Sequence, residues 1–160
     1  LNMTKPYGRS TTNERLKMPA PLHAKNVSVI GAINKEKILD IGLFEGTVVQ
    51  SCVETFIQSA LLPHLKAGDI LLLDNTPVHN IEKINRELLN PLGASALPLP
   101  RYSPDFSPIE MFWSKLKQTI QAINPRTMGE LYEAFANAVN EIDSDDLEGW
   151  YEHCGWTQGT

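Results

Sequence analysis

The pattern of apolar and polar positions becomes regular only after residue 25. Residues 1–25 are rich in Ser, Thr, Asn, Pro and basic residues without sustained periodicity, so we expect an irregular lead-in there. From Asn26 onward, a β-rich run to Ile33 and a second run from Ile38 to Phe44 flank a polar turn. Two such runs around a short turn predict a β-hairpin.

The next part of the chain alternates between helical spacing and short apolar strands. Apolar residues between Thr47 and Ala67 recur at intervals of three and four, which predicts a helix. The unbroken apolar run Ile70–Leu73 is typical of a strand that is buried on both faces. A second helix and a brief strand are expected after it, carried by Ile81, Ile84 and Leu88 and by Ser95–Leu97.

The clearest helix follows a proline-rich loop that runs from Pro98 to Ser107. Its apolar stripe, which stops before Asn124-Pro125, consists of Ile109, Phe112, Trp113, Leu116, Ile120 and Ile123. Thr127 and Glu130 match a capping box that opens another helix, and a last short helix is expected near the C-terminus. This order of elements predicts one α/β domain whose parallel strands are connected through helices.

Composition and charge add constraints on location and partners. Apolar residues make up 42% of the 160 residues, yet no apolar run approaches the roughly 18 residues that span a bilayer. We therefore expect a cytoplasmic protein. Cys52 and Cys154 lack the spacing of metal ligands, so we expect packed thiols. The net charge of −5 is the wrong sign for gripping DNA phosphates. Either nucleic acid is not the partner, or a basic DNA-gripping region lies elsewhere in a longer chain.

Two acidic residues stand where chemistry is expected. Asp74 ends the strand Ile70–Leu73, and ligands of open α/β sheets bind outside the carboxyl ends of strands. An Asp-Asn-Thr-Pro turn is the structural alternative. Glu110 lies at the third position of the clearest helix, behind Ser107 and Pro108, where a capping box is the alternative. Capping and metal binding can use different oxygens of one carboxylate, so both interpretations stay open.

Two segments together carry a family resemblance. Leu71–His79 reads LLLDNTPVH, and Leu99–Glu110 reads LPRYSPDFSPIE. They resemble the two signature motifs of mariner-like insertion-sequence transposases of the DDE superfamily, in which a strand ends with the second catalytic Asp and a helix starts near the catalytic Glu. The continuation of the second motif is matched by Trp113, Lys115 and Lys117. Weaker similarity covers the hairpin and both ends of the chain, at Tyr7-Gly8-Arg9 and Trp150–Trp156.

The resemblance implies a fold and a set of site residues. Over residues 26–160 it implies a ribonuclease H-like catalytic domain, with a five-stranded mixed sheet flanked by helices. Asp74 and Glu110 would be the catalytic residues and the ligands of Mg²⁺ or Mn²⁺. Asn75 and His79 belong to the first motif, and we expect His79 to be a hydrogen-bonding partner rather than a ligand. Candidate contacts to DNA phosphates, for which a solvated helix face is the alternative, are Arg101, Lys115 and Lys117.

The implied activity is nicking of DNA at insertion-sequence ends, followed by strand transfer into target DNA. Both DNAs are therefore the implied partners, within the bacterial cytoplasm and in association with the nucleoid. A homodimer is left open, and no membrane partner is expected.

The chain departs from the family pattern at the first catalytic Asp. In the family that residue lies on the first strand, but this sequence has no aspartate before Asp40. We therefore expect the first strand to be missing and this stretch to be inactive alone. Asp40 lies where the family has no catalytic residue, and Asp105 is expected to serve a turn. The rival hypothesis is a non-catalytic transposase relic that acts as a regulatory partner, and a different ribonuclease H-like nuclease is a third.

Overall fold

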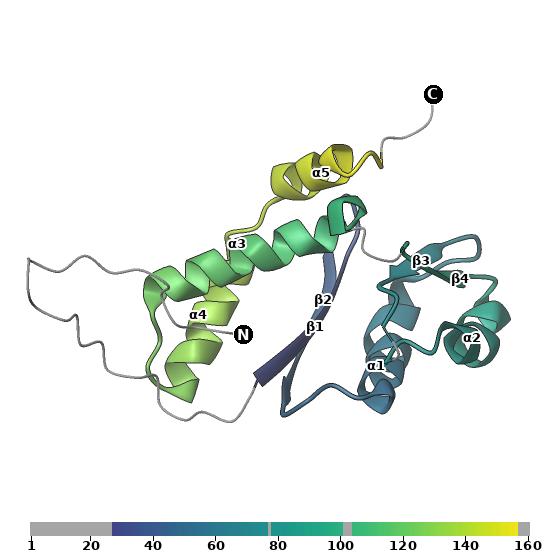
Figure 1. Cartoon of the computed structure of the whole chain (residues 1–160), viewed down its shortest axis with the longest axis horizontal. Coiled ribbons are helices and arrows are strands. Elements are labelled where there is room, and N and C mark those ends of the chain that lie inside the picture. Colours follow the sequence, from purple (N-terminus) through teal and green to yellow (C-terminus); the bar gives the residue numbers. More distant parts are fainter. Residues whose placement is uncertain (1–26, 77, 101–103, 157–160) are drawn as a thin grey trace, which may run out of the picture.

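The computed structural model describes residues 27–76, 78–100 and 104–156. In these ranges the chain has a mixed α/β fold with two small sheets and five α-helices (Figure 1). None of the helices described there is long and apolar enough to cross a membrane. The irregular lead-in expected over residues 1–25 lies outside the described residues.

The first sheet is a hairpin of β1 (Val27–Ile33) and β2 (Ile38–Glu45), which pair antiparallel. Its turn is closed by Asn34, whose side-chain oxygen accepts hydrogen bonds from the backbone N–H groups of Glu36 and Lys37 at 2.9 and 2.7 Å. Such side-chain closure is the usual role of Asn in turns. The predicted hairpin is confirmed.

The second sheet pairs β3 (Ile70–Leu73) with β4 (Ser95–Pro98) in parallel. Parallel strands need a crossover connection, and here it is α2 (Ile81–Ile84), which continues as a π-helical turn (Asn85–Leu89) and a 3₁₀ turn (Asn90–Leu92). The predicted order of strand, helix and strand is confirmed. The expected burial of β3 on both faces is wrong, because Ile70 is 57% exposed and Leu71–Leu73 are only half-buried. The carboxyl end of β3 is the point from which Asp74 projects.

The two sheets are separate, whereas the resemblance implies one mixed sheet. The described residues form the pairs β1–β2 and β3–β4, and no pairing joins β1 to β3. Instead, residues 30–34 and 69–73 line one cavity of about 400 Å³. The described residues therefore form two small sheets rather than one continuous mixed sheet, and the cavity separates β1 from β3.

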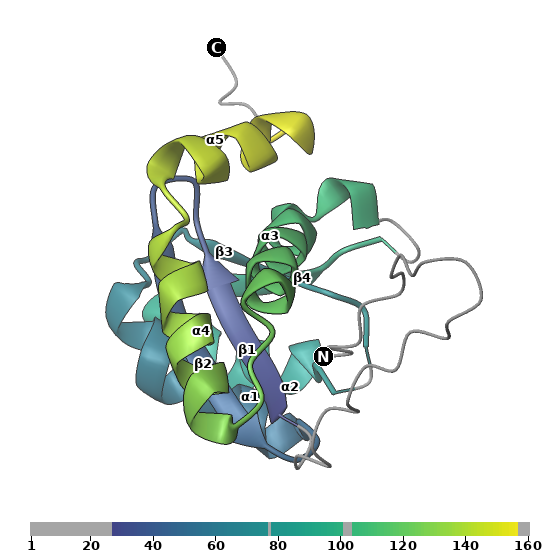
Figure 2. The ribbon, with the colours of Figure 1, turned by 90° about the vertical axis from the view of Figure 1, so that its left-hand side faces the viewer.

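Helices lie on both sides of the hairpin (Figures 1 and 2). On one side is α1 (Gln50–Phe56), whose helical path continues through tighter and wider turns to His64. On the other side are α3 (Pro108–Ile123) and α4 (Met128–Asn140), with α5 (Ser144–His153) beyond the tip of the hairpin. The hairpin is thus a middle layer.

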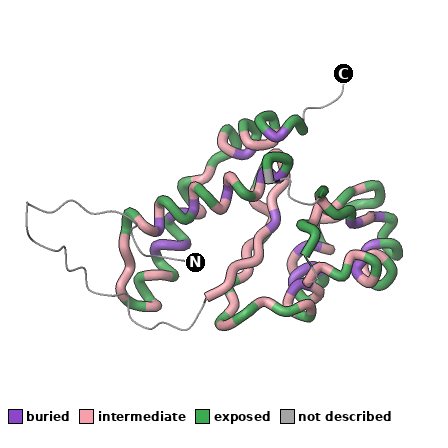
Figure 3. Tube along the Cα trace, viewed as in Figure 1, coloured by how far each residue is buried: buried purple, intermediate pink, exposed green. Residues whose placement is uncertain are grey.

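Side chains of β1 alternate between the helices on the two sides of the hairpin. Val29 and Ile33 pack into the core that contains α3 and α4, while Ile30 and Ala32 pack into the core that contains α1. Successive side chains of a strand point to opposite faces, so one strand can serve two cores. The tube in Figure 3 shows buried residues to either side of a half-buried hairpin.

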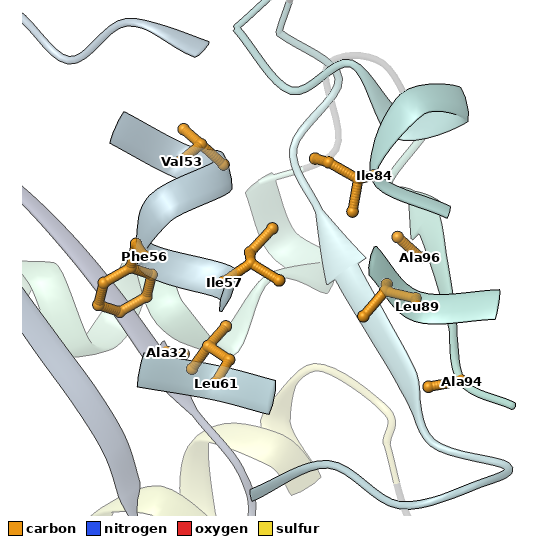
Figure 4. Close-up of a cluster of buried hydrophobic side chains, with 9 residues drawn as sticks. All are labelled: Ala32, Val53, Phe56, Ile57, Leu61, Ile84, Leu89, Ala94 and Ala96. Carbon is orange, nitrogen blue, oxygen red and sulfur yellow. The ribbon is translucent and has the colours of Figure 1, made fainter. Parts of the chain in front are cut away.

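The first core holds β3 in place. Buried side chains from the α1 segment, the α2 segment and β4 meet there with one residue of β1 (Figure 4). Leu71 and Leu73 of β3, which are half-buried, pack against this cluster, and each contributes less than the roughly 1.5–3 kcal/mol of a fully buried side chain. Its buried members are Ala32, Val53, Phe56, Ile57, Leu61, Ile84, Leu89, Ala94 and Ala96.

The second core holds α3 in place. The predicted apolar stripe of α3 is buried against α4, through Phe112, Leu116 and Ile120. The ring of Phe112 meets Trp113 and Trp150 edge-on, with ring centroids 4.7 and 6.3 Å apart. Such edge-to-face contacts add to the burial energy. The direction of α3 is fixed by this packing.

Both cysteines are free thiols, as predicted. Cys154 is buried and Cys52 is half-buried. Burial raises the pKa of the Cys154 thiol, and the negative charge of Asp105 raises it further. A thiol with a raised pKa is a poor nucleophile and metal ligand, so Cys154 acts as a packing residue.

Candidate active site

Asp74 stands at the carboxyl end of β3, as the sequence predicts. The Thr76 hydroxyl donates a hydrogen bond to Asp74 Oδ1 at 3.2 Å, and Nδ1 of His79 contacts the same oxygen. The other oxygen, Oδ2, makes no hydrogen bond or ion pair within the described ranges. Asp74 therefore has one oxygen engaged locally and one available to a ligand.

His79 is the half-buried partner of Asp74. Its Nδ1 also lies 3.2 Å from the backbone oxygen of Asp74. Both neighbours are acceptors, so we assign the proton to Nδ1. The hydrogen bond to Asp74 raises the pKa of His79 against the opposing effect of burial, and the same bond lowers the pKa of Asp74. The hydrogen-bonding role predicted for His79 is confirmed, and Asp74 is kept ionised.

Glu110 occupies the third position of α3, and its surroundings differ from those predicted. Ser107 makes no side-chain cap, and the Glu110 N–H bonds the backbone oxygen of Ser107 at 3.0 Å instead. The predicted capping box is therefore wrong, because Ser107 is buried in the cavity wall. The exposed Glu110 carboxylate makes no hydrogen bond or ion pair with any described residue. Both of its oxygens are available to a ligand.

One cavity connects the surroundings of the two carboxylates. It is the cavity between β1 and β3, and it also reaches the α1 segment and the head of α3. Leu73 and Ile109, which directly precede Asp74 and Glu110, both line it, as does His79. Folding therefore brings the end of β3 and the start of α3 to one hollow, and Asp74 and Glu110 directly follow residues that line it.

A complete metal-binding group is not formed by the described residues. Nowhere in the described ranges do three or more His, Cys, Asp or Glu side chains come together so that they could hold an ion. Asp40 is exposed on β2, where its Oδ1 accepts a hydrogen bond from the backbone of Ile41 at 2.6 Å. Asp105 is exposed in the 3₁₀ turn Pro104–Phe106. Neither belongs to a group of three such side chains within the described ranges.

The residues expected to support the site or touch DNA have different surroundings. Asn75 is exposed beside Asp74, and Arg101 lies outside the described residues. Lys115 is half-buried and forms an ion pair with Asp146. Lys117 is exposed and lines a second hollow together with Trp113 and the start of β1. Lys117 is therefore more accessible to a phosphate than Lys115 is.

Two aromatic residues near the C-terminus, for which no role was predicted, contact segments that line the cavity. The hydroxyl of Tyr151 donates to the backbone oxygen of Ile33 at 3.1 Å, and the indole N–H of Trp156 donates to the backbone oxygen of Phe106 at 2.8 Å. The concentration of aromatic residues in Trp150–Trp156 is the signal that points to this segment.

Comparisons with known proteins bear on the fold. A structure of the Mos1 transposase paired-end complex with the left transposon end is similar with a TM-score of 0.70 and 17% identity, over 94% of this chain and 47% of that chain. The Mos1 strand transfer complex is similar with a TM-score of 0.66 and 16% identity, over 96% and 47%. This chain thus spans about half the length of the structures it matches. No curated protein matches the sequence.

The comparison with protein families shows family membership, whereas the structural likeness shows only the fold. At these identities the likeness to Mos1 shows the shared fold. The DDE superfamily endonuclease family matches residues 1–131, which is most of the chain and includes both Asp74 and Glu110. The resemblance drawn from the two motifs is confirmed at this level. The chain belongs to the DDE superfamily endonuclease family.

Proposed function

We propose that this chain is part of a transposase catalytic core that nicks DNA at insertion-sequence ends and transfers the freed strand to target DNA. Asp74 and Glu110 would be its catalytic and metal-binding residues. The observation that carries the proposal is the meeting of the end of β3 and the head of α3 at one cavity, in a member of this family.

The donor set fits Mg²⁺ or Mn²⁺, which prefer carboxylate oxygens, water and substrate phosphate. Asp74 is ionised and has Oδ2 available, and Glu110 has both oxygens available among the described residues. When bound between such ligands and a phosphodiester, divalent ions activate a nucleophile and stabilise the leaving oxygen. The residues of this chain hold the ions and orient the phosphate.

The third carboxylate of the proposed site comes from a strand outside the described residues. β1 and β3 each have a partner strand on one side only in the described ranges, and both line the cavity between the sheets. A strand in that position would pair with both edges and satisfy their backbone groups. Since the cavity walls are mainly apolar on the α1 side and at the head of α3, its side chains would be apolar on both faces.

The proposed DNA partner accounts for the basic residues of α3. Lys117, at the second hollow, would contact a phosphate, and Arg101 in the second motif is a further candidate. The net charge of −5 is consistent with a catalytic part whose main grip on DNA lies in another region. A homodimer on DNA remains part of the proposal.

Metal binding at the two carboxylates gives the direct test. We expect Mn²⁺, titrated into the native chain and followed by electron paramagnetic resonance, to bind weakly. Asp74→Asn and Glu110→Gln should each remove this binding, while the matched control Asp40→Asn, an exposed aspartate outside the two signature motifs, should leave it unchanged. Equal binding by all four proteins would refute the proposed site.

Nicking of supercoiled plasmid separates the enzyme from the rival hypothesis of a non-catalytic relic. The chain alone should show little nicking with Mg²⁺ or Mn²⁺, because the described residues do not form a group of three metal ligands. Extending the polypeptide by the segment encoded directly upstream of Leu1 should restore nicking that depends on Glu110. Continued inactivity of the extended protein, with DNA or transposase binding retained, would favour the relic.

A further inference from the structure

The C-terminal segment is hydrogen-bonded to two of the segments that line the cavity, the end of β1 and the turn ahead of α3. Tyr151 of α5 bonds the backbone oxygen of Ile33 at the end of β1, and Trp156, just beyond α5, bonds that of Phe106 ahead of α3. Figure 1 shows α5 lying across the head of α3 and the tip of the hairpin. Two ion pairs add to these contacts: Lys35 with Glu148 at 2.9 Å, and Lys115 with Asp146.

The Trp156 contact acts on the segment that leads into α3. Phe106 ends the 3₁₀ turn, and Ser107, the next residue, is the N-cap of α3. Helix starts are commonly fixed by a side-chain cap, but Ser107 supplies none. The Trp156 indole instead holds the peptide group between Phe106 and Ser107 from outside the helix.

This peptide group is coupled to Glu110 by the backbone. The carbonyl of Ser107 accepts the Glu110 N–H at 3.0 Å, so a rotation of the Phe106–Ser107 segment displaces the first turn of α3. Phe106, Ser107 and Ile109 all line the cavity. The orientation of the Glu110 carboxylate relative to the end of β3 therefore depends on how firmly this segment is held.

We infer that Trp156 is a positioning residue for Glu110. Its indole N–H holds the entry into α3 so that the Glu110 carboxylate is directed toward the metal ion that it shares with Asp74. Trp156 itself touches neither metal nor substrate. The inference rests on the proposed function, since it assigns Trp156 to the metal site proposed there.

The test replaces Trp156 by Phe, which keeps an aromatic ring and removes the N–H donor. Tyr132→Phe is the matched control, because Tyr132 is 41% exposed against 40% for Trp156 and lies on α4. Two readouts are taken by NMR of the whole chain: exchange of the Glu110 amide hydrogen without metal, and Mn²⁺-induced broadening at Glu110 compared with Asn75.

We expect Trp156→Phe to speed exchange of the Glu110 amide by about fivefold, as loss of one neutral hydrogen bond allows. Broadening at Glu110 should fall by a similar factor while broadening at Asn75 persists, and Tyr132→Phe should change neither. A lower melting temperature with native exchange and broadening at Glu110 would overturn the inference and leave Trp156 a purely structural residue. Absence of Mn²⁺ broadening at both Glu110 and Asn75 in the native chain would instead refute the metal site itself, and the positioning role with it.

Discussion

Trp113 lies so close to Gly31 that a β-carbon on residue 31 would stand 2.8 Å from Cη2 of the indole. This contact is where α3 packs against β1. Only a residue without a β-carbon lets the two elements approach this closely, which gives Gly31 a specific packing role.

Gly31→Ala should therefore destabilise the protein by about 1–3 kcal/mol, the usual cost of overpacking a core. The free energy of unfolding in urea measures this. The control is Gly149→Ala in α5, where an added β-carbon meets nothing within 4 Å. That change should stabilise the helix by about 0.5–1 kcal/mol. A Gly31→Ala protein as stable as the native one would show that Trp113 moves aside without cost.

Stability should depend on pH through the pair of Asp74 and His79. The pKa of Asp74 is lowered from 3.8, chiefly by its hydrogen bond with His79, so its contribution is present above 3.8 and is lost as the pH falls through the lowered value. The pKa of His79 is raised from 6.5, so its contribution is present below 6.5 and is lost as the pH rises through the raised value.

The stability difference between the native protein and His79→Gln should accordingly be largest between pH 3.8 and 6.5. It should shrink on both sides of this window. Urea unfolding at a series of pH values measures the difference, and a difference that stays constant from pH 4 to pH 9 would contradict the ion pair.

Asn85 should be a costly residue to replace. Its side chain accepts a hydrogen bond from the N–H of Ala96 at 2.5 Å and donates one to the oxygen of Ala96 at 2.9 Å, which ties the α2 segment to β4. Ala96 is buried, so Asn85→Ala leaves unpaired backbone groups and should cost about 1–3 kcal/mol of unfolding free energy. Asn137→Ala, at an exposed position of α4, is the control and should change stability by less than about 0.5 kcal/mol.

The two lysines of α3 should respond differently to substitution. Lys117→Gln should weaken DNA binding and reduce the slope of log affinity against log salt by about one. Lys115→Gln should chiefly lower stability, because Lys115 is paired with Asp146. Fluorescence anisotropy with duplex DNA at several salt concentrations, beside thermal unfolding, distinguishes the two. An equal loss of DNA affinity for both variants would mean that Lys115 leaves its ion pair on binding.

Local sequence patterns predicted most of the helices and strands. The hairpin, the helix Pro108–Ile123 and the strand that leads to Asp74 all follow from periodicity, since each pattern spans only a few residues. The predicted cap of α4 is half confirmed. Thr127 accepts from the Glu130 N–H at 3.1 Å, but the Glu130 carboxylate accepts from the backbone of Arg126 instead.

Contacts between distant residues could not be predicted in this way. Tyr151 and Ile33 are separated by 118 positions, and Trp156 and Phe106 by 50. Local patterns likewise do not show whether β1 and β3 belong to one sheet, because this depends on whether another strand lies between them. Ser107 has a good capping side chain, yet its burial in the cavity wall removes it from that role.

The hairpin contributes residues to both cores, and this has a mechanical consequence for the two carboxylates. Asp74 is anchored through β3 in the first core, and Glu110 through α3 in the second. The hairpin connects the two cores, so bending of the hairpin would change the separation of the two carboxylates. The affinity for an ion bound by both carboxylates would therefore depend on the stiffness of the hairpin. A strand paired between β1 and β3 would stiffen the hairpin and raise this affinity.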